Sequence, residues 1–245
     1  MVIVTLPAYN EAATLPRLLV AIREAMEESQ IAYRVIVVDD GSTDGTAKAA
    51  RDTAALGIPL SVVSHETNRG LGEGIRTGLV QALADATDKD IIVTMDSDNT
   101  HGPGLIVRMV RNIREGNDVV IASRYRPGAR IKGVPGYRRV LSRVASILFR
   151  VVFPTPNVRD YTSGYRAYRA GILRKAFETY GQEFVAQSGF SCMVDILLKL
   201  RRLDAIISEV PMVLRYDLKE GVSKMLVVRT TLDTLALMVR RRISG

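Results

Sequence analysis

Short apolar runs alternate with stretches of helical periodicity along the first half of the chain. The runs are bounded by Pro, Gly, Asp and Asn, which predicts strands at residues 2–6, 34–38, 60–64, 91–95 and 119–122. Between them, apolar residues recur at helical spacing over residues 12–28, 43–55, 72–86 and 103–115. Thr43 and Asp44 are candidate N-caps of the second helix, and Gly116 is expected to end the fourth. This alternation predicts an α/β fold whose mostly parallel sheet is covered on both faces.

Polar residues follow three of the predicted strands at the point where each strand ends. The first strand runs into residues 7–11, the second into Asp39 and Asp40, and the fourth into Asp96 and Asp98. Asp and Asn are common in turns, but three such sites in register are less easily explained in that way, because ligands of parallel sheets bind beyond the carboxyl ends of the strands. The D-x-D spacing lets two carboxylates reach one Mg²⁺ or Mn²⁺, which takes its other oxygens from water and a diphosphate.

The glycine-rich segment 68–74 also follows a strand and opens a helix. Its spacing is G-x-G-x-G, and it follows the third strand instead of the first, so it does not match the dinucleotide fingerprint. Hydride transfer is therefore disfavoured. The glycines allow close approach of the backbone either to a neighbouring element or to a nucleotide.

Composition narrows the class of protein. The 245 residues are 47% hydrophobic, which is enough for one good-sized core or two small lobes and excludes a disordered chain. One Cys and two His exclude a disulfide framework and a structural zinc site. No uncharged apolar stretch is long enough to span a bilayer, and the N-terminus lacks the basic region of a signal peptide. We therefore expect a soluble or surface-bound intracellular protein.

Charge is distributed unevenly along the chain, although the net charge is only +8. Residues 1–100 carry 8 basic and 15 acidic side chains, whereas residues 101–175 carry 16 basic and 3 acidic ones. A middle third this basic indicates an anionic partner, such as a phosphate, a nucleic acid or an acidic membrane surface. Charge alone does not choose among these, and an ordinary solvated surface is equally compatible with it.

Several motifs together resemble those of the family 2 inverting glycosyltransferases: residues 7–11, 37–46, 68–72 and 95–98, with His101 and Pro103 following. Residues 122–125, 162–168 and 221–224 resemble more narrowly the dolichol-phosphate mannosyltransferases and their polyprenyl-phosphate relatives. The resemblance covers about residues 2–225 and implies the nucleotide-sugar-binding sandwich called GT-A. It implies one domain over 1–245, with a nucleotide-sugar half (1–125), an acceptor half (126–225) and an amphipathic basic tail (226–245).

The resemblance also assigns roles to individual positions. It places the donor nucleoside on Pro7, Tyr9, Glu11, Val38 and Asp40. It places the metal and diphosphate on Asp96 and Asp98 with the Ser97 backbone, the donor phosphates on Arg124 and Lys224, and the lipid phosphate on Arg138 and Ser142. Asp98, Arg124 and Arg138 would be the catalytic residues. Two positions depart from the family pattern: Thr100 stands where relatives have a Gln metal ligand, and Leu218 where they have an Arg.

The implied reaction is metal-dependent transfer of a hexose to a dolichyl or polyprenyl phosphate for protein glycosylation, with mannose from GDP-mannose preferred. A phosphate monoester has a second pKa near ~6 and is mostly a dianion at pH 7. Such an acceptor needs positioning, for which arginine is suited, whereas a hydroxyl acceptor would need a general base. In-line attack would invert the anomeric centre. The scarcity of acids in residues 101–175 favours the phosphate acceptor.

Three other functions remain open at this stage. The protein could be a relative that uses UDP-glucose or a soluble hydroxyl acceptor. Nucleic-acid binding is opposed by an aromatic content of only 6% and by the absence of Trp. Loss of catalysis on an intact fold is opposed by the intact D-x-D sequence.

Residues 137–153 form the most amphipathic segment of the chain. Apolar side chains from Tyr137 to Val151 recur at spacings of three and four, while Arg139, Arg143 and Arg150 form a separate stripe. This pattern is typical of a basic helix at a membrane surface, but a core-facing helix with its arginines outward fits it equally. The resemblance favours the membrane, as a peripheral protein on its cytoplasmic face. The apolar tail 225–239, which is followed by three arginines, is a second candidate contact, and a membrane-anchoring subunit is a possible partner.

Overall fold

A computed structural model describes residues 1–187, 189 and 191–218 of the chain. Lys224, the motif at 221–224 and the tail 225–245 lie outside the described residues, so the expectations that concern them stay predictions.

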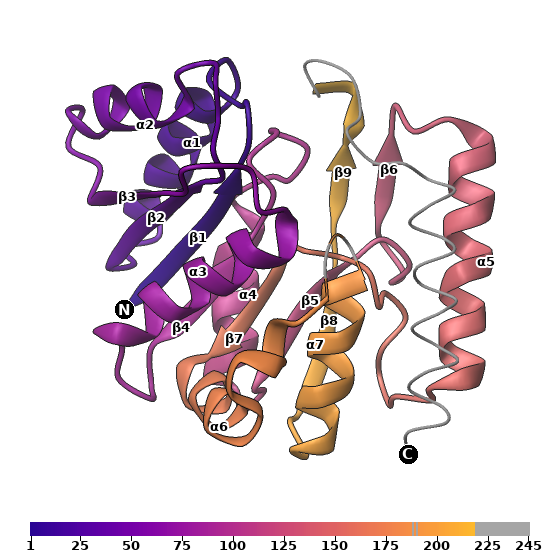
Figure 1. The fold of residues 1–245 in the computed structure, drawn as a ribbon. Helices are drawn as coiled ribbons and strands as arrows, with labels where there is room; N and C mark the ends of the chain where they lie inside the picture. The colour runs from indigo at the N-terminus through magenta and orange to yellow at the C-terminus, as the bar shows by residue number, and fades with distance from the viewer. Residues whose placement is uncertain (188, 190, 219–245) are drawn as a thin grey trace.

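The centre of the molecule is a seven-stranded sheet with the strand order β3-β2-β1-β4-β7-β5-β8 (Figure 1). Its strands are β1 (Val2–Ala8), β2 (Tyr33–Asp39), β3 (Leu60–Ser64), β4 (Ile91–Thr94), β5 (Val119–Ser123), β7 (Arg166–Arg169) and β8 (Ile207–Pro211). Neighbouring strands pair in parallel except β7, which runs antiparallel to both β4 and β5. The expected mostly parallel sheet is confirmed, and it joins strands from both expected halves of the chain.

Helices cover both faces of this sheet and bury two apolar clusters. One cluster lies under α3 (Leu71–Ala84), α6 (Ala170–Tyr180) and α7 (Ser191–Arg202), together with the 3-10 turn η1 (Gly181–Val185). The other lies under α1 (Leu15–Glu28) and α4 (Leu105–Arg114), with α2 (Thr46–Ala54) beside α1. The mostly apolar strands β1 and β4 are buried from both sides, as is usual for parallel sheets.

The predicted element boundaries hold to within a few residues, with one correction. The second helix begins at Thr46 and its N-cap is Gly45, so the expectation that Thr43 or Asp44 caps it is wrong. Both residues bond to the loop after β1: the Thr43 N–H donates to Asn10 and the Asp44 carboxylate accepts from Ala12. The other oxygen of Asp44 accepts the Thr46 N–H at 3.0 Å, so Asp44 still stabilises the helix start from the position before the N-cap. The fourth helix ends at Arg114, and Gly116 follows in a left-handed conformation that suits its expected role as a stop.

Helix α5 (Gly136–Val152) stands apart from the main sheet, beside a two-stranded sheet of β6 (Arg130–Lys132) and β9 (Val213–Arg215), which the short turn η2 (Tyr216–Leu218) follows (Figure 1). Its apolar stripe faces outward, because seven large side chains on it are exposed: Tyr137, Val140, Leu141, Val144, Ile147, Leu148 and Val151. Its buried side chains are Ser146 and Phe149. The alternative interpretation of the sequence, that the apolar stripe of this helix faces the core, is therefore wrong. In the described part of the chain, no helix combines the length and apolar character needed to cross a bilayer.

Candidate active site

The loops after β1, β2 and β4 meet at one edge of the sheet because these strands end side by side. The loop after β1 is tied to the loop after β2, since the Asn10 N–H donates to Ser42 Oγ at 2.9 Å. It is tied to the loop after β4 by Ser97 Oγ, which donates to the Pro7 carbonyl at 2.9 Å. The three polar segments that follow strands in the sequence, each of which contains acidic residues, thus lie together in the structure. Pro7, Tyr9 and Glu11 are partly exposed along this edge.

Asp40 is buried and anchors the glycine-rich segment. Its carboxylate accepts the N–H groups of Arg69 at 2.9 Å and Gly70 at 2.8 Å, and it lies 2.7 Å from Nδ1 of His65. Gly41 has φ +71°, and a Cβ there would come within 2.4 Å of the Thr67 backbone, so only glycine fits this turn. These contacts favour a packing role for the glycine-rich segment.

The expected nucleoside roles of Asp40 and Val38 remain predictions. The side chain of Val38 is fully buried in the core under α3, where Gly78 leaves room for it.

Asp96 and Asp98 follow β4 in different environments. The Asp96 side chain is 33% exposed, whereas Asp98 is buried and its Oδ1 accepts from the Thr100 hydroxyl at 2.6 Å and the Thr100 N–H at 3.1 Å. Thr100, the departure from the family pattern, therefore orients Asp98. Within the described residues, no three His, Cys, Asp or Glu side chains gather to hold a metal. Two carboxylates suit Mg²⁺ or Mn²⁺, because these ions take several of their ligands from water and from a bound diphosphate.

His101 and the loop before β7 lie against Asp96. The Asp96 N–H points to Nδ1 of His101 at 3.4 Å, and the His101 ring stacks on Tyr165 with centroids 5.0 Å apart. A Cβ on Gly164 would lie 3.3 Å from Oδ1 of Asp96, so the main chain of this loop passes close to the carboxylate. The loop that carries the 162–168 motif is therefore part of the same site.

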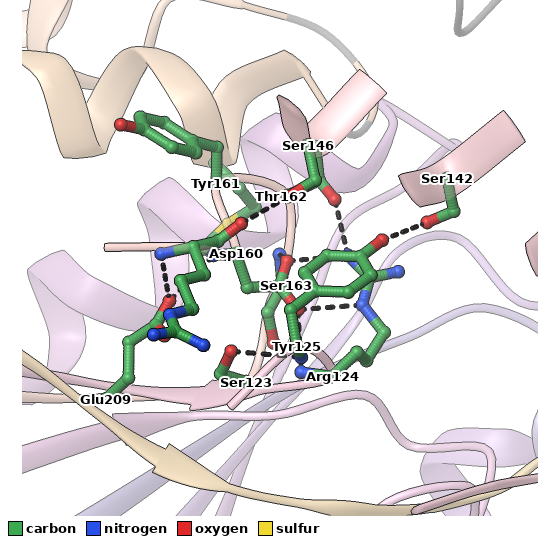
Figure 2. A network of polar contacts seen from close by, with 12 residues as sticks. Ser123, Arg124, Tyr125, Ser142, Ser146, Asp160, Tyr161, Thr162, Ser163 and Glu209 are labelled. Atoms are coloured by element: carbon green, nitrogen blue, oxygen red, sulfur yellow. Dashed lines mark hydrogen bonds and ion pairs between the residues drawn. The ribbon is translucent and has the colours of Figure 1, made fainter. Parts of the chain in front are cut away.

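Arg124 directly follows β5 and is held by the fully buried carboxylate of Asp160, which comes from the segment before β7 (Figure 2). Its Nε and Nη2 donate to the two oxygens of Asp160 at 2.8 and 2.7 Å, and its backbone N–H donates to the same group at 2.9 Å. Nη2 also donates to Thr162 Oγ1 at 2.5 Å. Such a two-pronged ion pair fixes the guanidinium plane. Arg124 therefore reaches the site in one defined orientation.

The electrostatics of this pair are set by burial and by its own contacts. Burial alone would raise the pKa of Asp160, but the charge of Arg124 and its hydrogen bonds outweigh burial and hold that pKa below its usual value. Burial opposes the charge of Arg124, yet Asp160 raises the pKa of this arginine, and Asp96 adds to the effect. The pair is therefore ionised, and Arg124 is near enough to Asp96 to feel its charge.

The two residues expected at the acceptor phosphate are partly buried on α5, on the side of the helix that carries the buried Ser146 and Phe149. Ser142 Oγ is 2.5 Å from the hydroxyl of Tyr125, whose ring centroid is 5.4 Å from the Arg124 guanidinium carbon. Arg138 donates through Nη1 to the Tyr216 hydroxyl at 3.2 Å. Ser142 is thus connected to Arg124 through Tyr125, whereas Arg138 contacts Tyr137 and Tyr216.

Sequence reasoning missed several residues that shape this site, among them Asp160, Tyr125 and Glu209. Glu209 on β8 accepts the N–H groups of Arg159 and Asp160, both at 2.6 Å, and fixes the loop from which Asp160 reaches Arg124 (Figure 2). Burial raises the pKa of Glu209, although these two hydrogen bonds oppose the shift. One feature of the sequence could have pointed to Asp160: it is one of only 3 acidic residues in the basic segment 101–175.

Comparison with known proteins supports the resemblance found in the sequence. The model of the family described as glycosyl transferase family 2 matches residues 3–177. The undecaprenyl-phosphate mannosyltransferase of Micrococcus luteus is 35% identical over 86% of this chain and 82% of the relative. The polyprenol monophosphomannose synthase of Mycolicibacterium smegmatis is 33% identical over 91% and 80%. The dolichol-phosphate mannosyltransferase of Pyrococcus furiosus is 30% identical over 80% of this chain but 52% of its own length.

Solved structures with the same architecture include glucosyl-3-phosphoglycerate synthase from Mycobacterium tuberculosis. Its complex with Mn²⁺, UDP and glucosyl-3-phosphoglycerate superposes with a TM-score of 0.64 at 25% identity, covering 99% of this chain and 77% of that one. Its complex with Mn²⁺, UDP-glucose and phosphoglyceric acid gives a TM-score of 0.69 at 23% identity, over 99% and 79%. The expected GT-A fold is confirmed.

Proposed function

The chain belongs to glycosyl transferase family 2, and on that premise we propose that it transfers mannose from a nucleotide sugar to a dolichyl or polyprenyl phosphate. The names of relatives that are 33–35% identical support this sugar and this acceptor. The observation that carries the proposal is the placement of Arg124 between the Asp96–Asp98 turn and the inner side of α5. An arginine fixed in one orientation between two phosphate groups suits a reaction whose donor and acceptor are both phosphates.

Each group in the site has a separate task in this reaction. A bound Mg²⁺ or Mn²⁺ held by Asp96 and Asp98 would neutralise charge that develops on the leaving diphosphate. Arg124 stabilises the same charge from a preorganised position, which requires no reorientation during transfer. Arg138 and Ser142 hold the acceptor phosphate, which is already a dianion at neutral pH and needs no general base. In-line attack by its oxygen on the anomeric carbon then gives a β-linked product.

The donor is proposed to be GDP-mannose, with UDP-glucose as the alternative. The relatives named as mannosyltransferases favour mannose. A structural neighbour binds UDP-glucose and phosphoglyceric acid, which keeps a glucosyl donor and a soluble acceptor among the outcomes to be tested.

The direct test is a matrix of donors and acceptors with Mg²⁺ or Mn²⁺. We expect mannosyl transfer from GDP-mannose to a short polyprenyl phosphate, and little transfer from UDP-glucose or to 3-phosphoglycerate. Product analysis by mass spectrometry and by anomeric coupling in NMR identifies the sugar and its configuration. Efficient glucosylation of 3-phosphoglycerate without any lipid would overturn the proposed acceptor.

We also propose that α5 rests on the cytoplasmic face of a membrane, where a polyprenyl phosphate is met. Its exposed apolar stripe supports this, because large outward-facing apolar side chains on an amphipathic helix are typical of interfacial helices. The inner side of the same helix carries Arg138 and Ser142. Seating the helix in the headgroup region would therefore bring the lipid phosphate to these two residues.

Charges placed in the apolar stripe should weaken this attachment. The double variant Leu141→Glu/Leu148→Glu is expected to bind liposomes at least about tenfold more weakly, because two apolar side chains are lost from the interface. Leu56→Glu/Ile206→Glu changes two apolar residues away from α5 that are more exposed than the two leucines, and it serves as the control. Sedimentation with liposomes measures binding, and circular dichroism checks folding. A folded α5 variant that binds as well as the control would contradict the attachment.

A further inference from the structure

Two cavities outside the catalytic edge share a wall of arginines. One, of about 500 Å³, lies between α4 and β8 and is lined by Arg108, Arg126 and Arg159. The other, of about 430 Å³, lies at the end of α5 and is lined by Arg126, Arg150 and Arg159. Because Arg126 and Arg159 line both, the cavities form one arginine groove, which we define by these four residues.

No ion pair among the described residues neutralises the positive charge of the arginine groove. None of the ion pairs in the described part of the chain involves any of the four arginines, in contrast to Arg124 and Arg169, which are paired with Asp160 and Asp118. The one acid among the residues that line the groove is Glu209. One of its carboxylate oxygens already accepts two backbone N–H groups at 2.6 Å, and burial raises its pKa. Four unpaired guanidinium groups around one groove match a phosphate group.

The groove adjoins the apolar stripe of α5. Arg150 lies on α5 next to Val151, which is 73% exposed, and one turn from Ile147, which is also exposed. A phosphate bound at Arg150 would therefore sit beside a surface that suits acyl chains. A lipid offers both parts, whereas a soluble phosphate would leave the apolar stripe unused.

We propose that the arginine groove binds the headgroup phosphate of an acidic membrane lipid, separately from the polyprenyl phosphate at Arg138 and Ser142. This rests on the proposed seating of α5 at a membrane. The bound lipid would fix the orientation of the enzyme on the bilayer. The end of α5 would be held by the charge of its arginine, and the rest of the helix by apolar contact. The groove would then make acidic membranes the preferred surface.

The test compares vesicles of phosphatidylcholine alone with vesicles that also contain phosphatidylglycerol. Wild type is expected to prefer the acidic vesicles, and Arg126→Gln/Arg159→Gln should weaken binding to them by about tenfold or more, since each arginine at an acidic surface adds measurably to affinity. Binding to pure phosphatidylcholine should be unchanged. Transfer to a short polyprenyl phosphate in detergent should also be unchanged, because neither side chain lies in the catalytic site.

Arg111→Gln/Arg114→Gln is the matched control, because it removes the same charge from two exposed arginines of α4 that do not line the groove. Equal weakening by both pairs would mean a diffuse surface effect and would overturn the groove. Displacement of wild type from acidic vesicles by soluble glycerol phosphate at matched phosphate concentration would identify a soluble anion instead of a lipid. Failure of wild type to bind either vesicle would overturn the membrane seating itself, an outcome distinct from the other two.

Discussion

Replacing Asp98 with asparagine is expected to abolish transfer while leaving the fold intact. The substitution removes one of the two carboxylates proposed to hold the metal and diphosphate, which should lower kcat by about 10²–10³-fold or more. An asparagine oxygen can still accept from the Thr100 hydroxyl and N–H, which now bond to Asp98 at 2.6 and 3.1 Å. The free energy of unfolding should therefore fall by only about 1 kcal/mol, which corresponds to a Tm shift of about 2–4 °C.

The control for this prediction is Asp52→Asn, the same chemical change at an exposed carboxylate that pairs with Lys48 at 2.6 Å. Steady-state kinetics with added Mg²⁺ or Mn²⁺, and calorimetry of both variants, separate catalysis from folding. Excess EDTA should reduce the activity of wild type to the same degree. Addition of Mn²⁺ in excess over EDTA should restore that activity. Full activity of Asp98→Asn, or of wild type in EDTA, would refute a metal-bound donor.

Replacing Asp160 with asparagine should cause the largest loss of stability of any single isosteric change near the site. Asp160 is fully buried, and its removal leaves the charge of Arg124 without a partner. Breaking a buried ion pair costs about 3–5 kcal/mol, whereas Asp85→Asn at the exposed Arg34 pair should cost less than about 1 kcal/mol. Urea unfolding measures both. A cost for Asp160→Asn no larger than for Asp85→Asn would contradict the buried pair.

The pH dependence of this stability has a defined sign. Because Arg124 holds the pKa of Asp160 below the ordinary value of 3.8, the stabilisation is complete above that value and is lost as pH falls through the lower folded-state pKa. The difference between wild type and Asp160→Asn should therefore shrink on acidification. The double variant Arg124→Gln/Asp160→Asn should lose less unfolding free energy than the two single variants lose together, because both substitutions remove the same interaction.

Much of the fold could be predicted because the first half of the chain is periodic and well punctuated. The five strands from β1 to β5 are short apolar runs between turn residues, and each is found close to its expected place. The strands β7 and β8 were not predicted. β7 has only four residues and begins and ends with arginine, so it carries no apolar run of its own. Its place in the sheet is decided by pairing with β4 and β5, which local sequence does not encode.

The candidate site was predictable where polar residues directly follow strands, as Asp40, Asp96 and Asp98 do. It was not predictable where side chains meet across large sequence separations, as Arg124 and Asp160 do. The orientation of α5 was also undetermined, because an amphipathic pattern fixes which residues share a face but not what that face meets. Exposure of Leu141 and Val144 in the folded chain decides that question.

The reversed direction of β7 has a consequence for how the acceptor side of the enzyme can vary. Since β7 runs against its neighbours, its first residue, Arg166, lies beside Thr94 at the end of β4, so the chain enters the site immediately before the strand. From Gly136 at the start of α5 to Arg166, one continuous stretch supplies the outward-facing helix, Asp160 and the loop beside Asp96, with no other helix or strand between. These features therefore belong to one uninterrupted segment of the chain. Its exchange between relatives would move the outward-facing apolar stripe of α5 and the carboxylate that anchors Arg124 together.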